Sequence, residues 1–212
     1  MHFGKEKVKK MNCIEKIIHE NPALAPCREA MEAITAAIVS MHKCGGKLLL
    51  CGNGGSASDC EHISGELLKG FLSKRPVAQD ALPGLDAEIR EKLQRGIGAI
   101  PLPSLSALST AFSNDVDPAL TFAQGVFALG QKGDIFLGLS TSGNAKNVIA
   151  AMKVAKAMGL TTIAMTGESG GAMKAIADIA LTVPETETYK VQQLHLPAYH
   201  AICAEAERIL FG

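Results

Sequence analysis

The chain has 212 residues, of which 47% are apolar and 20% charged, a composition typical of a soluble globular protein rather than a disordered one. It carries 21 basic and 21 acidic residues, so no net charge directs it to nucleic acid or to an anionic membrane. No apolar run is long enough to span a bilayer, and the basic first residues lack the apolar segment of a secretory signal. We therefore expect a cytoplasmic protein with reduced thiols and no membrane or nucleic-acid partner.

The predicted elements alternate between short apolar runs and amphipathic segments. Two helices come first, at 12–20 and 28–42. Strands are expected, in chain order, at 47–51, near 98–101, and at 135–139, 161–165 and 179–183. Helices are expected at 56–68, 144–158, 170–177 and 188–210, the last interrupted by Pro197. Apolar strands alternating with helices predict an α/β fold, a doubly wound parallel sheet of about five strands with helices on both faces.

The segment 75–103 is unusual because it is rich in Pro and Gly but also has Leu85, Ile89 and Leu93 at helical spacing. We expect a loop that carries one small helix. Neither a repeat nor a long linker divides the chain. We therefore take residues 1–44 as an N-terminal helical extension and residues 45–212 as a single compact domain.

A glycine-rich loop, Asn53-Gly54-Gly55-Ser56, joins the first predicted strand to the helix after it. Consecutive glycines allow a sharp turn and bring backbone N–H groups close to a ligand, and Ser56 adds a hydroxyl at the positive end of a helix. The loop lacks the Lys of a Walker A motif and the third glycine of GxGxxG. Taken alone, it is explained equally well as a tight turn with an N-cap serine.

A second loop of this kind favours a binding function. Ser140, Thr141, Ser142, Gly143 and Asn144 also lie between a predicted strand and a predicted helix. Three hydroxyls and an amide at a helix N-terminus can hold a phosphate without a basic side chain. Two such loops in one sheet indicate a shared anion site.

His62 and Glu66 are four residues apart on the helix that follows the first loop, so they share one face of it. This spacing suits a metal pair or a base beside its polar partner. A solvated helix face is the alternative for an isolated His/Glu pair, and the nearby phosphate loop favours the functional interpretation. Gln192 and His200, eight residues apart, project from broadly one side of the terminal helix.

Three segments, GNGGSASDCEH, LSTSGN and VQQLHLPAYH, resemble in order and spacing the phosphoheptose isomerase branch of the SIS (sugar isomerase) superfamily. The resemblance runs from about the end of the second helix to the C-terminus. It implies a flavodoxin-like SIS fold and an aldose–ketose isomerase that acts through an enediol. The implied substrate is sedoheptulose 7-phosphate and the implied product is D-glycero-D-manno-heptose 7-phosphate.

The resemblance also implies roles for single residues. Glu66 is expected to be the catalytic base, with His200 as its partner acid or base. His62, Glu66, Gln192 and His200 are expected to hold one Zn²⁺ per subunit. Substrate and phosphate contacts are expected from Asn53, Gly54, Gly55, Ser56, Asn114, Asp115, Ser140, Thr141, Ser142, Asn144 and Gln192. The family further implies a homotetramer whose active sites are shared between subunits.

The sequence departs from the family pattern around the sugar. Ala145 and Tyr189 stand where relatives have a phosphate-binding serine and a sugar-binding aspartate, and Lys69 is the nearest substitute for a displaced basic residue. For His195 we favour a hydrogen bond at a subunit contact over a ligand role. Three alternative functions stay open: a non-catalytic SIS module that binds DnaA or another protein, a sugar-phosphate-sensing domain, and an isomerase of a different sugar phosphate.

Overall fold

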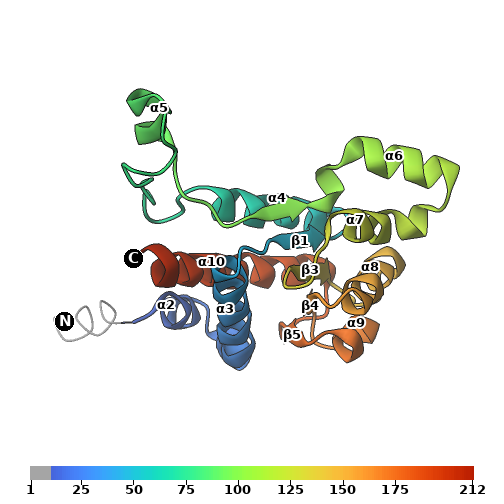
Figure 1. Ribbon diagram of the computed structural model, residues 1–212. Coiled ribbons are helices and arrows are strands. Elements are labelled where there is room, and N and C mark those ends of the chain that lie inside the picture. The colour runs from blue at the N-terminus through green and yellow to red at the C-terminus, as the bar shows by residue number, and fades with distance from the viewer. Residues whose placement is uncertain (1–10) are drawn as a thin grey trace, which may run out of the picture.

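The short apolar runs form the strands of one sheet in the computed structural model, which describes residues 11–212 (Figure 1). The strands are β1 Leu48–Cys51, β2 Ala99–Pro101, β3 Ile135–Ser140, β4 Thr161–Thr166 and β5 Ile179–Thr182. All neighbouring strands are parallel, in the order β2-β1-β3-β4-β5. The predicted α/β class is confirmed, with the strand near 98–101 included.

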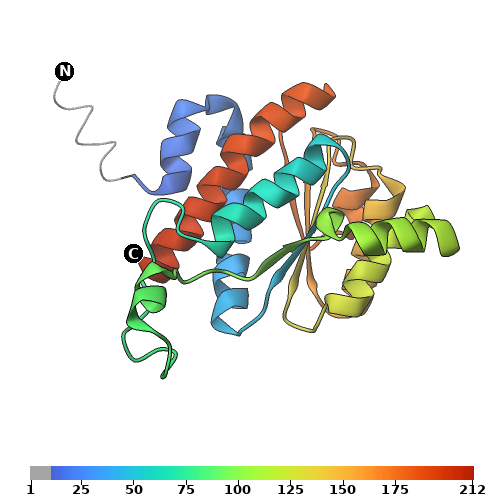
Figure 2. The ribbon, with the colours of Figure 1, turned by 90° about the horizontal axis from the view of Figure 1, so that it is seen from above.

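Alternate residues of the central strands pack into two separate cores, one on each face of the sheet. Leu48 and Leu50 of β1 face one core, and Leu49 and Cys51 face the other. The first core is covered by α2 Cys13–Glu20, α3 Arg28–Lys43, α4 Gly55–Leu68 and α10 Thr188–Phe211. The second is covered by α7 Thr121–Leu129, α8 Lys146–Ala157 and α9 Gly171–Ile176 (Figure 2). Strands β1 and β3 are buried on both faces, which is why they are largely apolar.

The terminal helix α10 runs unbroken through Pro197, so the predicted interruption is wrong. Proline removes one backbone donor from the helix ladder, but burial on both sides of it outweighs that loss. Val191 and His195 precede Pro197, Tyr199 and Ile202 follow it, and all four are buried. The whole helix therefore stays attached to the sheet and to α4.

The segment after α4 leaves the body of the protein and returns to it. It contains α5 Ala87–Lys92, β2 and the short 3-10 helix η2 Leu102–Ser104, which matches the predicted loop with one small helix. No residue of α5 is buried, and Ile89 is 48% exposed, so its apolar spacing does not reflect packing within the chain. Figure 1 shows α5 projecting from the body, and α6 Ser106–Asp115 projecting at another corner. The 3-10 helix η3 Pro118–Leu120 connects α6 to α7.

The base of the α5 segment is held by a buried ion pair. Nε of Arg75 lies 2.6 Å from Oε1 of Glu207, and their side chains are 0% and 3% exposed. Glu207 also accepts N–H hydrogen bonds from Phe71, Leu72 and Ser73 at 2.8, 2.7 and 3.0 Å. Burial favours the protonated form of Glu207, but these donors outweigh burial and lower its pKa. The C-terminal turn of α10 therefore anchors the chain as it leaves α4.

The N-terminal helices share the core of the α10 face. Residues 11–44 form α2, the 3-10 helix η1 Pro22–Cys27 and α3, and Ile14, Leu24 and Ile34 are buried in that core. Residues 1–10 of the predicted extension lie outside the described residues, and the division at residue 44 stays a prediction. Across residues 11–212, every helix is too short or too polar to cross a membrane.

Candidate active site

The first glycine-rich loop turns from β1 into α4 through a backbone conformation that favours glycine. Gly54 has φ of +56° and is the N-cap of α4, which has no side-chain cap. Ser56 is therefore not an N-cap serine. It lies within the first turn of α4 and is 3% exposed. A Cβ on Gly55 would come within 2.5 Å of the amide nitrogen of Gln192, so the glycine is what lets Gln192 lie against this loop.

The second loop leaves β3 at the same edge of the sheet. Gly143 has φ of +67°, and a Cβ there would lie 2.1 Å from the carbonyl oxygen of Gly170. The following helix α8 begins at Lys146, later than predicted, so Asn144 precedes its N-cap. The Asn144 side chain accepts from the N–H of Ala172 and donates to the carbonyl oxygen of Ser142, both at 3.0 Å. Asn144 thus braces this loop against α9.

The two loops meet because β1 and β3 are neighbours, with Cys51 paired to Gly138. The amides of Asn53 and Asn147 exchange two hydrogen bonds, each of 2.9 Å, which joins the first loop to the start of α8. Strand order reverses between these two strands, and in open α/β sheets ligands bind at such a point. The N-termini of α4 and α8 therefore converge, as an anion site needs.

Further along α4, two imidazoles and a carboxylate converge. Nε2 of His62 lies 3.3 Å from Oε1 of Glu66 and 3.2 Å from Nε2 of His200, which α10 supplies. Each of the three residues offers one ligand atom, and these atoms lie within 4.8 Å of one another. Burial and the neighbouring His62 lower the pKa of His200, which keeps this imidazole neutral at neutral pH. Two imidazole nitrogens and a carboxylate oxygen are the donor set of zinc sites that keep a position for substrate, so these residues fit Zn²⁺.

The cluster lies down the helix from the anion site. At a rise of 1.5 Å per residue, His62 is about 9 Å along the α4 axis from Ser56. A sugar chain with its phosphate at the loops can thus reach the cluster with its other end. Nζ of Lys69 lies 3.4 Å from Oε2 of Glu66. Lys69, the substitute for the displaced basic residue of the family, therefore contacts the Glu66 carboxylate.

The remaining predicted residues have contacts outside the cluster. The side-chain amide of Gln192 lies against Gly55, at the start of α4. Asn114 and Asp115 are exposed in the last turn of α6, where the Asn114 amide donates to the Asp115 carboxylate at 2.8 Å. Among residues 11–212, none of the hydrogen bonds of these two side chains reaches another candidate residue. The metal role of Gln192 and the sugar contacts of Asn114 and Asp115 stay predictions.

His195 is a core residue of this chain. It is 0% exposed, Nε2 lies 3.3 Å from the carbonyl oxygen of Thr166, and burial lowers its pKa to about 4. Our preference for a hydrogen bond at a subunit contact was therefore wrong about the place. The hydrogen bond is inside the chain, because this face of α10 packs on the end of β4.

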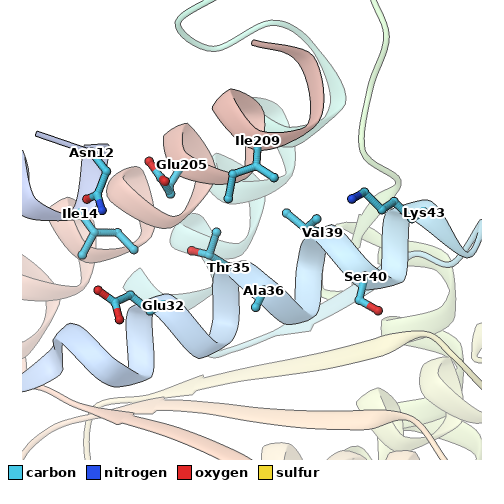
Figure 3. Close-up of a pocket in the computed structure, with 10 residues that line it drawn as sticks. All are labelled: Asn12, Ile14, Glu32, Thr35, Ala36, Val39, Ser40, Lys43, Glu205 and Ile209. Atoms are coloured by element: carbon cyan, nitrogen blue, oxygen red, sulfur yellow. The ribbon is translucent and has the colours of Figure 1, made fainter. Parts of the chain in front are cut away.

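A groove on the other side of α10 holds none of the candidate residues. Its volume is about 470 Å³, and it lies between α2, α3 and α10 (Figure 3). Its lining includes Thr35, Val39 and Ile209, with Glu32 and Lys43 at the rim. This mixture of side chains offers neither a phosphate cradle nor a catalytic pair.

Comparisons with known proteins agree with this geometry. A family model described as the SIS domain matches residues 107–204. The phosphoheptose isomerase of Crocosphaera subtropica is 40% identical over 203 residues, which covers 96% of this chain and 91% of that protein. The one from Sulfurimonas denitrificans is 36% identical and covers 99% and 96% of the two chains. The chain belongs to the phosphoheptose isomerase family.

Solved structures of the phosphoheptose isomerase family have the same fold. The phosphoheptose isomerase GmhA of Neisseria gonorrhoeae superposes with a TM-score of 0.74 at 30% identity, over 92% of this chain and 94% of that one. The phosphoheptose isomerase of Francisella tularensis gives a TM-score of 0.76, also at 30% identity, over 89% and 91%. The likeness thus covers about nine tenths of this chain.

Three residues that contact the site are not among the residues predicted from the sequence: Asn147, Asp59 and Tyr199. Asp59 lies three residues before His62, so helical spacing could have placed both on one face. The hydroxyl of Tyr199 lies 3.3 Å from Oδ1 of Asp59 and 3.0 Å from Nδ1 of His62. Burial and the Asp59 carboxylate raise the pKa of Tyr199, so it stays a neutral hydroxyl. For Tyr199 the sequence signal was its place directly before His200 in the segment VQQLHLPAYH.

Proposed function

We propose that this chain is an aldose–ketose isomerase that interconverts sedoheptulose 7-phosphate and D-glycero-D-manno-heptose 7-phosphate through an enediol. The observation that carries the proposal is the Glu66 carboxylate beside two imidazoles, on the helix whose N-terminus forms part of the anion site. Family membership over nearly the whole chain supports the same chemistry.

The substrate phosphate binds at the convergent N-termini of α4 and α8. Backbone N–H groups of Gly54 and Gly55, with the hydroxyls of Ser140, Thr141 and Ser142, are the expected donors. Anchoring the phosphate fixes the far end of the sugar in position, so that its carbonyl lies beside the cluster. The chain as a whole has no net charge, so these local donors must hold the phosphate.

Glu66 acts as the base of the isomerisation. It takes a proton from the carbon next to the carbonyl, which leaves an enediolate, and it returns that proton to the former carbonyl carbon. His200, neutral because its pKa is lowered, moves the proton between the two oxygens of the enediol. The number of protons is conserved, and the carbonyl moves between C1 and C2 without a net change of oxidation state.

His62, Glu66 and His200, with Gln192 as the predicted fourth ligand, are the residues that would hold one Zn²⁺ per subunit. When bound, the ion supplies a Lewis acid that polarises the substrate carbonyl. A carboxylate held tightly by a metal is a weaker base, so a bound ion would reduce the basicity of Glu66.

We further infer that the enzyme is a homotetramer with shared active sites. The His62 side chain is 43% exposed, and Asn53, Ser142 and Asn144 are exposed as well. Carbanion chemistry is protected when water is excluded from the site. A second copy that covers this face supplies that protection.

The deciding experiment is incubation with sedoheptulose 7-phosphate in D₂O, followed by NMR, with zinc or with EDTA. The expected result is the aldose product with deuterium on the carbon that receives the proton, and slower turnover with EDTA. Absence of product and of exchange would overturn the heptose assignment. A panel of other sugar phosphates then separates a different isomerase from a non-catalytic protein-binding module.

A further inference from the structure

The hydroxyl of Tyr199 links two side chains of α4 that lie on the same face. It is 3.0 Å from Nδ1 of His62 and 3.3 Å from Oδ1 of Asp59. The Tyr199 and His62 rings pack edge to face, with centroids 5.4 Å apart, and the tyrosine is 2% exposed. The phenol is therefore held in place by the residues around it. It contacts His62 of the cluster but is not itself one of the three residues of the cluster.

The direction of these two hydrogen bonds follows from counting protons. The phenol has one proton to donate, and an ionised carboxylate can only accept. Across residues 11–212, Oδ2 of Asp59 is buried without a hydrogen-bond partner, and the Tyr199 hydroxyl is the donor to Oδ1. The phenol proton therefore goes to the half-buried Asp59 carboxylate, where a hydrogen bond to charge is strongest.

The hydroxyl oxygen of Tyr199 is then left to accept, and the group beside it is Nδ1 of His62. His62 can donate to this oxygen only if the proton of its neutral imidazole is on Nδ1. Nε2 then carries the lone pair, and it faces Nε2 of His200 at 3.2 Å and Oε1 of Glu66 at 3.3 Å. In metal sites the hydrogen bond made by the far ring nitrogen sets the tautomer in this way.

We propose that Tyr199, oriented by Asp59, is a positioning residue that keeps the lone pair on Nε2 of His62 and so prepares the cluster for a divalent metal ion. The proposal rests on the proposed function in one respect: it takes His62, Glu66 and His200 as a metal site. Outer hydrogen-bond partners of this kind are worth tenfold to a hundredfold in metal affinity.

The first test measures zinc affinity in the metal-free protein by competition with a chromophoric chelator. Tyr199→Phe keeps the ring and removes the hydroxyl, and it should weaken zinc binding at least tenfold. Tyr189→Phe is the matched control, because Tyr189 is the other tyrosine of the chain and is 57% exposed. That control should bind zinc as the unaltered protein does.

The second test reads the tautomer directly. The ¹⁵N shifts of His62, in zinc-free protein at a pH where imidazole is neutral, should place its proton on Nδ1. Tyr199→Phe should move the proton towards Nε2. Asp59→Ala should do the same with the tyrosine present, because the freed phenol then donates to Nδ1; this variant also carries the test if Tyr199→Phe does not fold.

A folded Tyr199→Phe protein with unchanged zinc affinity and an unchanged His62 tautomer would overturn the proposal. Neither measurement involves substrate. A failed isomerase assay therefore leaves these results unaffected, and a failed positioning test leaves the isomerase proposal unaffected.

Discussion

Nε2 of His200 lies 3.2 Å from Nε2 of His62, although the two histidines are 138 residues apart in the chain. Two N–H groups cannot face each other at this distance, so at least one nitrogen presents a lone pair to the other. The Glu66 carboxylate lies 3.3 Å from the same nitrogen of His62. The three groups therefore share a position for one proton or one cation.

Glu66→Gln should reduce turnover at least a hundredfold, because the amide cannot take the proton from carbon. The free energy of unfolding should change little, since the two side chains have nearly the same shape. Glu61→Gln is the control on the same helix, where the exposed Glu61 carboxylate accepts from the Ser104 hydroxyl at 2.8 Å. Turnover of the Glu66→Gln protein close to that of Glu61→Gln would remove Glu66 from the role of base.

Arg75→Met should lower the free energy of unfolding by about 3–5 kcal/mol, because it leaves the Glu207 carboxylate buried without its cation. The measurement is urea unfolding at neutral pH. Lys92→Met is the matched control, since the pair it breaks with Glu88 has side chains 73% and 82% exposed. Lys92→Met should lower the free energy of unfolding by under about 1 kcal/mol. Equal losses in the free energy of unfolding would mean that the buried pair stabilises the protein no more than the exposed pair does.

His195 should make stability depend on pH. Burial lowers its pKa from 6.5 to about 4, so between these values the unfolded chain binds a proton that the folded chain does not. Stability from this residue is full above pH 6.5 and is lost as the pH falls towards about 4, by about 3 kcal/mol in all.

Urea unfolding at several pH values checks the His195 prediction. The loss between pH 6.5 and 4 should be about 3 kcal/mol smaller in His195→Gln, which keeps a donor for the Thr166 carbonyl. His19→Gln, which replaces an exposed histidine, is the control. Parallel pH profiles for His195→Gln and the unaltered protein would contradict the prediction.

Gly143→Ala should distort the second loop and weaken phosphate binding. The alanine Cβ would lie 2.1 Å from the Gly170 carbonyl oxygen, at a backbone φ of +67° that side chains rarely adopt. We expect a loss of about 1–3 kcal/mol in the free energy of unfolding and a raised KM for the sugar phosphate.

Gly65→Ala is the control for Gly143→Ala. Gly65 is exposed within α4 and has nothing within 4 Å of its Cβ position, so alanine there should stabilise the helix by about 0.5–1 kcal/mol. A Gly143→Ala protein as stable and as tightly binding as Gly65→Ala would show that the second loop does not need its glycine.

Much of the architecture could be predicted because it depends on local patterns. The strands at β1 and β3 are apolar runs bounded by glycine, and such runs are buried wherever the chain folds. The i, i+4 spacing of His62 and Glu66 required only that α4 be a helix. The continuity of α10 through Pro197 could not be predicted in this way, because packing on the sheet outweighs the local preference of proline.

The sequence by itself determined the fold class, the two glycine-rich loops and the pairing of His62 with Glu66, since each depends on residues close together in the chain. Only the tertiary structure placed His200 against His62, buried His195 on Thr166, and set Tyr199 between Asp59 and His62. These contacts join α4 or β4 to α10. They depend on the register in which the terminal helix packs, and that register is decided by the shape of the whole core.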